Sequence, residues 1–211
     1  MEERFRGGYK PAKIGRMTYY YATIDFTEEP YQAVYGCEGG TKADIPATLD
    51  GLPVREVCTS EDFLGKGFES KKIILPRGLR SVRQQAFYTN AHITELVVPD
   101  SVEIVGWRAF AACPKLTHLT LPFKHLITLP VAFKGTVGIK KIHITDWKKT
   151  LGREAFWGLV LSAYEIMSKA RRGASLTAQE EQAMALYTPL GWPDYVHEFS
   201  EDFDTLFRGM L

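Results

Sequence analysis

The chain has 211 residues, and its 45% hydrophobic and 24% charged content is ordinary for a folded protein with one sizeable domain. A net charge of +1 gives no overall attraction to nucleic acid or anionic lipid, and no apolar run reaches the roughly 20 residues of a membrane span. Three cysteines without a CxxC spacing argue against a disulfide scaffold or a zinc site and suit a reducing compartment. We expect no metal, no cofactor and no membrane span, and nucleic acid is not the expected partner.

The first 44 residues are expected to form a flexible arm followed by an N-terminal cap. Residues 1–16 are basic and contain Gly7, Gly8 and Pro11, which predicts a flexible basic arm. Aromatic and β-branched residues at 18–26 and 31–35 flank a turn, so residues 17–44 are expected to form an N-terminal β-hairpin cap. Its tyrosines are expected to pack in the cap and not to form a ligand cage.

The N-terminal sequence also bears on location. It lacks the apolar run of a signal peptide, which predicts a cytoplasmic protein. A secreted or cell-surface location fits only if this sequence is a trimmed mature form.

An Ala-Phe pair recurs every 23 residues, at 86–87, 109–110, 132–133 and 155–156. Between these pairs stands an apolar pattern LxxLxL, which is typical of the strand of a leucine-rich repeat. Its members are Ile93, Leu96 and Val98, then Leu116, Leu119 and Leu121, then Ile139, Ile142 and Ile144. Stacked coils are expected to pair these strands into a parallel sheet, with Leu96 and Val98 inward and Val97 outward.

A second apolar set precedes the Ala-Phe pairs and is expected on the opposite side of each coil. It consists of Val82, Val105 and Leu151, with Thr128 as the weak member. The Phe of each pair should fill the core, while the Ala allows close backbone approach. Residues 61–68 are expected to replace the Ala-Phe turn in a longer first coil that begins at Ile45.

Residues 98–122 read hPxxhxxhxxxAFxxCxxLxxLxLP, where h is apolar, and this motif resembles the BspA-type (Treponema-type) leucine-rich repeat. Cys113 stands where that family often has a cysteine. The resemblance covers about residues 17–158. It implies an α/β fold class: a short leucine-rich-repeat solenoid with a parallel sheet, assigned to residues 45–158. Departures from the motif at 128–130 and after Ile144 predict that the repeats stop there.

The last 53 residues have a different character. Residues 159–211 are expected to be a helical C-terminal cap or docking region, with Thr177 and Glu180 forming a capping box before a helix over about 178–188. An apolar tail either packs on itself or docks onto a partner. Its possible docking residues are Trp192, Tyr195, Phe199, Phe203 and Phe207.

Few residues in the sequence suggest catalysis. Phosphate-binding glycine loops, HExxH and GxSxG are all missing. His118 and His143 have no third metal ligand at a matching position, and Cys113 is expected to be a buried small side chain. We therefore predict no catalytic residues and no enzyme activity.

The sequence favours a non-catalytic module that binds a protein partner of unknown identity, and the resemblance implies bacterial adhesion or host interaction. The alternatives are an accessory or regulatory subunit docking through its C-terminal helices, a glycan-binding module, and a solvated face without a partner. The candidate binding residues are those expected to face outward from the parallel sheet: Lys71, Lys72, Arg77, Glu95, Val97, His118, Thr120, Phe123, Lys140, Lys141 and His143.

Overall fold

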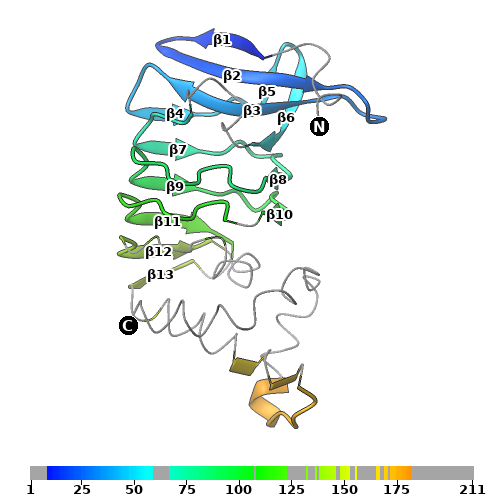
Figure 1. Ribbon diagram of the computed structural model, residues 1–211, viewed down its shortest axis with the longest axis vertical. Helices are drawn as coiled ribbons and strands as arrows, with labels where there is room; N and C mark the ends of the chain where they lie inside the picture. Colours follow the sequence, from blue (N-terminus) through cyan, green and yellow to red (C-terminus); the bar gives the residue numbers. More distant parts are fainter. Residues whose placement is uncertain are drawn as a thin grey trace.

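The structure is a computed structural model that describes residues 9–58, 67–106, 108–122, 132, 136, 138–145, 148–152, 155, 165–166, 169–170 and 172–181. Its described residues are mostly β-structure, stacked along one axis (Figure 1). The strands are β1 (Lys10–Ile14), β2 (Met17–Ile24), β3 (Tyr31–Glu38), β4 (Lys42–Asp44), β5 (Thr48–Leu49), β6 (Leu52–Val57), β7 (Lys72–Ile74), β8 (Ser81–Val82), β9 (Glu95–Val97), β10 (Ile104–Val105), β11 (His118–Leu121), β12 (Lys141–Ile144) and β13 (Lys149–Gly152).

The strands form two sheets that enclose a common core. The repeat sheet has the order β13-β12-β11-β9-β7-β4, and its strands from β4 to β12 pair in parallel. The hairpin sheet has the order β1-β2-β3-β6-β8-β10, with β5 paired to β6. The first three coils each contribute one strand to each sheet, as the pairs β4 and β6, β7 and β8, and β9 and β10 (Figure 1). The predicted short parallel solenoid is confirmed.

Two columns of aliphatic side chains line the core from opposite sides. In the repeat sheet, Leu96 lies in register with Ile73 and Leu119, and all three are at most 2% exposed. In the hairpin sheet, Val82 lies in register with Val57 and Val105, and these are equally well buried. Both predicted apolar sets are therefore present in the coils from β7 to β11.

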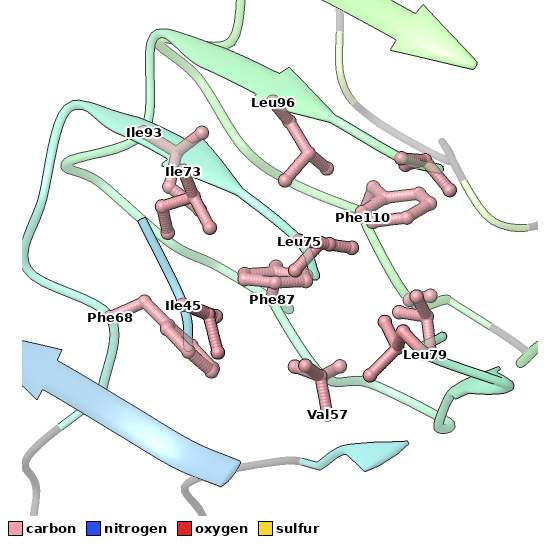
Figure 2. Packing of buried hydrophobic residues seen from close by; sticks show 14 of the residues in the cluster. Ile45, Val57, Phe68, Ile73, Leu75, Leu79, Phe87, Ile93, Leu96 and Phe110 are labelled. Atoms are coloured by element: carbon pink, nitrogen blue, oxygen red, sulfur yellow. The ribbon is translucent and has the colours of Figure 1, made fainter. Parts of the chain in front are cut away.

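A column of phenylalanine rings fills the space between the two sheets (Figure 2). The ring of Phe87 lies 4.7 Å from that of Phe68 and 5.7 Å from that of Phe110, measured between centroids. Each such pair adds about 0.5–1.5 kcal/mol to the gain from burial. Phe68 takes the place of the Phe of the Ala-Phe pair in the first coil, while residues 61–66 of the predicted replacement lie outside the described residues.

Small residues allow the backbones of adjacent coils to approach closely beside this column. The amide of Phe87 donates to the carbonyl of Ala109 in the next coil at 2.8 Å, and Ala109 is completely buried. At Gly106, a Cβ atom would lie 2.3 Å from the amide nitrogen of Gln84. A side chain there would force the two coils apart.

Left-handed backbone positions recur with the same period. Gln85 and Arg108 are 23 residues apart and have φ of 56° and 52°, while Thr89 and Ala112, equally spaced, also have φ of 56° and 52°. Left-handed backbone is disfavoured for residues with a Cβ atom. Its recurrence shows that the corner of each coil has the same shape whatever residue occupies it.

A ladder of polar side chains satisfies the carbonyl groups of the buried phenylalanines. Asn90 Nδ2 donates to the carbonyl of Phe68 at 2.8 Å, and the Cys113 thiol donates to that of Phe87 at 3.0 Å. Thr136 Oγ1 donates to the carbonyl of Phe110 at 2.7 Å. Cys113 is therefore buried, as predicted. Its thiol also has the same task as Asn90 and Thr136 in the neighbouring coils, because it donates to a phenylalanine carbonyl.

The N-terminal hairpin β2–β3 is present and continues into the solenoid, because β3 pairs in parallel with β6. Its tyrosines tie the cap to the first coil: Tyr19 Oη donates to the carbonyl of Asp44 at 2.7 Å, and Tyr21 Oη donates to Asp50 Oδ2 at 2.5 Å. Burial raises the pKa of both phenols to about 12, so they remain donors in neutral solution. These tyrosines pack as the sequence predicts.

The expectation of a flexible arm over residues 1–16 is wrong for Lys10–Ile14. These residues form β1, which pairs antiparallel with β2 through a tight turn at Gly15, whose φ is 60°. Pro11 is tolerated because β1 is an edge strand, and the backbone groups on the open side of an edge strand have no neighbouring strand to bond to. The strand β4, assigned to the cap by the sequence, already belongs to the repeat sheet.

The position predicted for Leu151 is also wrong. Leu151 lies in β13, which runs antiparallel to β12 and places Leu151 opposite Ile142 in the repeat sheet. The chain thus turns back on the last parallel strand of the described residues. Phe133, Phe156 and Thr128 lie outside the described residues.

Part of the predicted C-terminal helical region is described. The amide of Thr177 donates to Glu180 Oε2 at 2.8 Å, and the amide of Glu180 donates to Thr177 Oγ1 at 3.3 Å. This is the predicted capping box, and helix begins at residue 178. Whether residues 159–211 cap the solenoid or dock onto a partner remains a prediction.

Replacing Phe87 by Ala should lower the free energy of unfolding by about 3–5 kcal/mol, because the ring is buried between two neighbouring rings. Urea denaturation followed by circular dichroism measures the change. Phe26→Ala is the matched control, since Phe26 is 58% exposed and should cost less than 1 kcal/mol. An equal loss of unfolding free energy in the two variants would contradict a stabilising role for the phenylalanine column.

Replacing Cys113 by Ser and by Ala separates the two roles of this side chain. Ser keeps a donor for the Phe87 carbonyl, whereas Ala leaves that carbonyl without its side-chain partner. The Phe87 carbonyl keeps the amide of Asn90 as a partner in both variants, so the Ala variant should be about 0.5–1.5 kcal/mol less stable than the Ser variant in urea denaturation. An Ala variant as stable as the Ser variant would show that the thiol contributes only its volume.

Candidate protein-binding surface

The outward side chains of the repeat sheet form two rows across the strands. One row contains Lys42, Lys72, Glu95, His118 and Lys141, which lie in register on β4, β7, β9, β11 and β12. The other row contains Asp44, Ile74, Val97, Thr120 and His143 in the same register. Alternation along each strand puts the core residue between them inward, so we call these two rows together the outer face.

Backbone hydrogen bonds fix the starts of β7, β9, β11 and β12 on this face. The carbonyl of Lys71 accepts the amides of Thr94 and Glu95, and the carbonyl of Thr94 accepts those of Thr117 and His118. The hydroxyl groups add a second ladder: Thr94 Oγ1 donates to the Lys71 carbonyl at 3.2 Å, and Thr117 Oγ1 donates to the Thr94 carbonyl at 3.1 Å. The rows are therefore held by the backbone and do not depend on contacts among their own side chains.

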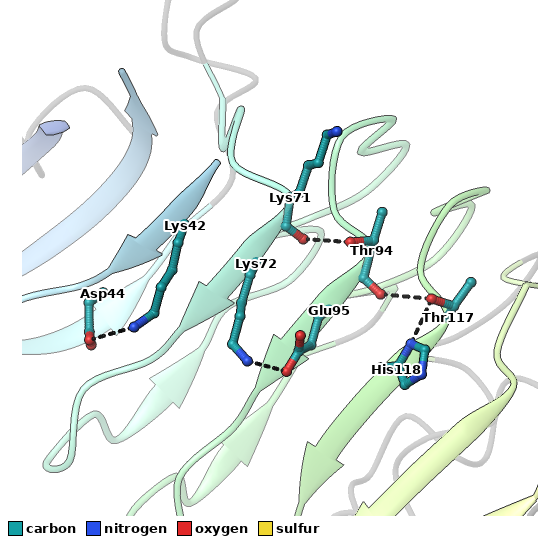
Figure 3. A network of polar contacts seen from close by, with 8 residues as sticks. All are labelled: Lys42, Asp44, Lys71, Lys72, Thr94, Glu95, Thr117 and His118. Carbon is teal, nitrogen blue, oxygen red and sulfur yellow. Dashed lines mark hydrogen bonds and ion pairs between the residues drawn. The ribbon is translucent and has the colours of Figure 1, made fainter. Parts of the chain in front are cut away.

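Charges on the N-terminal part of the outer face neutralise one another (Figure 3). Lys72 forms an ion pair with Glu95 on the neighbouring strand, and Lys42 Nζ lies 3.6 Å from Asp44 Oδ2. All four side chains are at least 36% exposed. Pairs this exposed contribute little to stability, of the order of 0–1 kcal/mol, so they chiefly set the local charge pattern.

The histidine rings are oriented by neighbouring threonines. His118 Nδ1 lies 2.9 Å from Thr117 Oγ1, and His143 Nδ1 lies 3.1 Å from Thr150 Oγ1 on β13. Thr150 was not among the predicted site residues. The amino-acid sequence around it gives no sign that the chain reverses after β12. The threonine ladder was also missed, although the 23-residue spacing of Thr94 and Thr117 could have revealed it.

Most predicted site residues are described. The structure brings Lys72, Glu95, Val97, His118, Thr120, Lys141 and His143 onto the outer face, and it places Lys71 and Lys140 at the starts of strands beside it. Arg77 is exposed in a turn beyond the end of β7 and so lies outside the rows. Phe123 and the proposed docking residues Trp192, Tyr195, Phe199, Phe203 and Phe207 lie outside the described residues.

Within the described residues, no group of three or more His, Cys, Asp or Glu side chains could hold a metal ion. Cys37, Cys58 and Cys113 are buried free thiols. Burial raises the pKa of Cys113 to about 12 and also raises that of Cys37, so neither is an activated nucleophile. The part of the chain that the structure describes contains no helix long and apolar enough to cross a bilayer.

Comparison with known proteins identifies the repeat. The sequence profile of the "BspA type Leucine rich repeat region" matches residues 63–169 with 6 copies. No curated protein gives a significant match.

Three solved structures are similar to the chain. The pneumococcal vaccine antigen PcpA is 14% identical with a TM-score of 0.44, over 66% of this chain and 39% of PcpA. The T. pallidum leucine-rich-repeat protein TpLRR is 18% identical with a TM-score of 0.39, over 63% of this chain and 71% of TpLRR. A leucine-rich cell surface protein of Faecalibacterium prausnitzii is 13% identical with a TM-score of 0.38, over 65% of this chain and 43% of that protein.

The chain spans less than half the length of two of these three proteins. The family profile, in contrast, covers slightly more than half of this chain, including the strands β7, β9, β11 and β12 of the outer face. Its match agrees with the 23-residue stacking seen in the structure. The chain belongs to the BspA-type leucine-rich repeat family.

Proposed function

We propose that the chain is a non-catalytic module that binds a protein partner through the outer face of its repeat sheet. Leucine-rich-repeat solenoids are generally binding scaffolds, because stacked coils present a long continuous surface. The observation that carries the proposal is the register of the two outward rows across β4, β7, β9, β11 and β12. These side chains are free to contact a partner because the core is complete without them.

The mixed chemistry of the outer face supports protein recognition. Ile74 and Val97 are half-buried apolar side chains in one row of the outer face, and Lys72 and Glu95 lie in the other row on the same two strands. Protein interfaces likewise combine apolar side chains with a polar border. Among the described residues, the hairpin sheet presents two exposed large apolar side chains far apart, Ile14 at 49% on β1 and Ile104 at 57% on β10.

Two settings are proposed for this binding. Adhesion or host interaction is what the family resemblance implies, whereas a cytoplasmic location would make the chain an accessory subunit of a larger assembly. Antibody labelling of intact cells that naturally produce the chain distinguishes them. Labelling without permeabilisation supports the surface role, and labelling only after permeabilisation supports the intracellular role.

Site-specific photocrosslinking tests the use of the outer face. A photoreactive phenylalanine at His118 or at Lys141, both exposed, should form covalent adducts with one and the same protein in native lysate. The same group at Ile104, on the other sheet, is the matched control and should form none with that protein. Mass spectrometry identifies the adducts.

Adducts with the same protein from Ile104 alone would contradict binding through the outer face. If the partner still copurifies but crosslinks only from Trp192 or Phe203, the C-terminal tail docks in its place. Adducts with glycoproteins that disappear after deglycosylation would favour glycan binding.

A further inference from the structure

Positive charge is concentrated in one part of the solenoid. Residues 104–153 contain nine of the 26 lysines and arginines but only one of the 25 acidic residues, Asp146. That segment therefore has a net charge of +8, while the rest of the chain has a net charge of −7. The overall value of +1 hides this separation, which coincides with the coils that carry β10, β11, β12 and β13.

On the outer face, this part differs from the N-terminal part. We call His118, Lys140, Lys141 and His143 the basic cluster. Lys42 and Lys72 have carboxylate partners, but Lys140 and Lys141 are exposed and have no carboxylate within 4.0 Å among the described residues. The lysines of the basic cluster are therefore available to an external ligand.

The basic cluster is held in place by the strands beneath it. The carbonyl of Thr117 accepts the amide of Lys140 at 2.9 Å and that of Lys141 at 3.1 Å. Lys141 lies in register with His118, and His143 lies two residues further along the same strand. A partner would meet charges whose backbone positions are already fixed, which lowers the entropy cost of binding.

We propose that the basic cluster binds an acidic, extended peptide segment of the protein partner. This inference rests on the proposed function and names the chemistry of the ligand for the part of the outer face formed by β11 and β12. Carboxylates of the segment would pair with Lys140 and Lys141, while Thr120 on β11 and Val97 on β9 would contact its uncharged side chains further along the sheet. The charge of the cluster steers the segment to this end of the sheet.

The same residues are a poor match for nucleic acid. The outward side chains of β11 and β12 are His118, Thr120, Lys141 and His143, so only two imidazole rings on these strands could stack on a base. Single-stranded nucleic acid is usually held by such stacking together with a long basic groove. A short cluster on a flat sheet suits a few carboxylates better.

Fluorescence anisotropy with a labelled peptide tests the proposal. The probe is a peptide of about ten residues that alternates Glu and Thr, long enough to cross the strands of the cluster. The full chain should bind it at low salt, and raising the salt to about 0.5 M should weaken binding at least tenfold, because exposed charges are then screened. A peptide with Gln in place of Glu should not bind.

Two double variants with the same change of net charge provide the control. Lys140→Glu with Lys141→Glu should weaken binding of the acidic peptide by about tenfold or more. Lys10→Glu with Lys13→Glu, at exposed lysines on β1, should change the affinity less than twofold. Circular dichroism spectra of both variants verify that they are folded.

Three outcomes would overturn the proposal. Equal loss in the two double variants would mean that overall charge alone attracts the peptide. Equal binding of the Gln peptide would exclude carboxylate recognition, while the crosslinking result at His118 would still decide whether the outer face binds a protein. Tighter binding of single-stranded DNA than of the peptide, with the same loss on Lys140→Glu and Lys141→Glu, would identify a nucleic-acid site.

Discussion

The ring of Phe87 packs between those of Phe68 and Phe110, and the rest of the solenoid depends on this column. A coil of 23 residues cannot bury its own apolar face, so it is stable only against its neighbours. The column supplies that contact, while the donors of Asn90 and Cys113 satisfy the phenylalanine carbonyls that the stacking buries. Burial and hydrogen bonding therefore require the same spacing between coils.

This spacing determines the surface as well as the core. Once Leu96 and Leu119 lie in register inside, Glu95 and His118 must lie in register outside, because side chains alternate along a strand. The core sequence is thus repeated and the outer residues are free to vary. In this chain they change from paired charges at β7 and β9 to basic residues at β12 that have no carboxylate partner in the described part of the chain. The proposed specificity depends on that change.

The repeating part of the fold could be predicted from the sequence, since Ala109, Phe110 and Cys113 mark the coil by their spacing alone. The two ends could not. β1 contains Pro11 and exposed residues, and only its position at the sheet edge makes it a strand. Leu151 fits the repeat spacing but lies in an antiparallel strand, because the chain reverses direction between β12 and β13. Hydrogen-bond partners such as Thr150 and His143 result from that reversal and have no signature in the sequence.

Disulfide formation between adjacent strands tests most directly whether the stacking sets the register of the outer face. Neighbouring strands are about 4.8 Å apart, within the range that a disulfide spans, whereas strands two apart are beyond it. His118→Cys with Lys141→Cys should therefore form an intramolecular disulfide on mild oxidation, detected by mass spectrometry. Glu95→Cys with Lys141→Cys should remain reduced, because β11 lies between them. A disulfide in the second variant and none in the first would contradict the account.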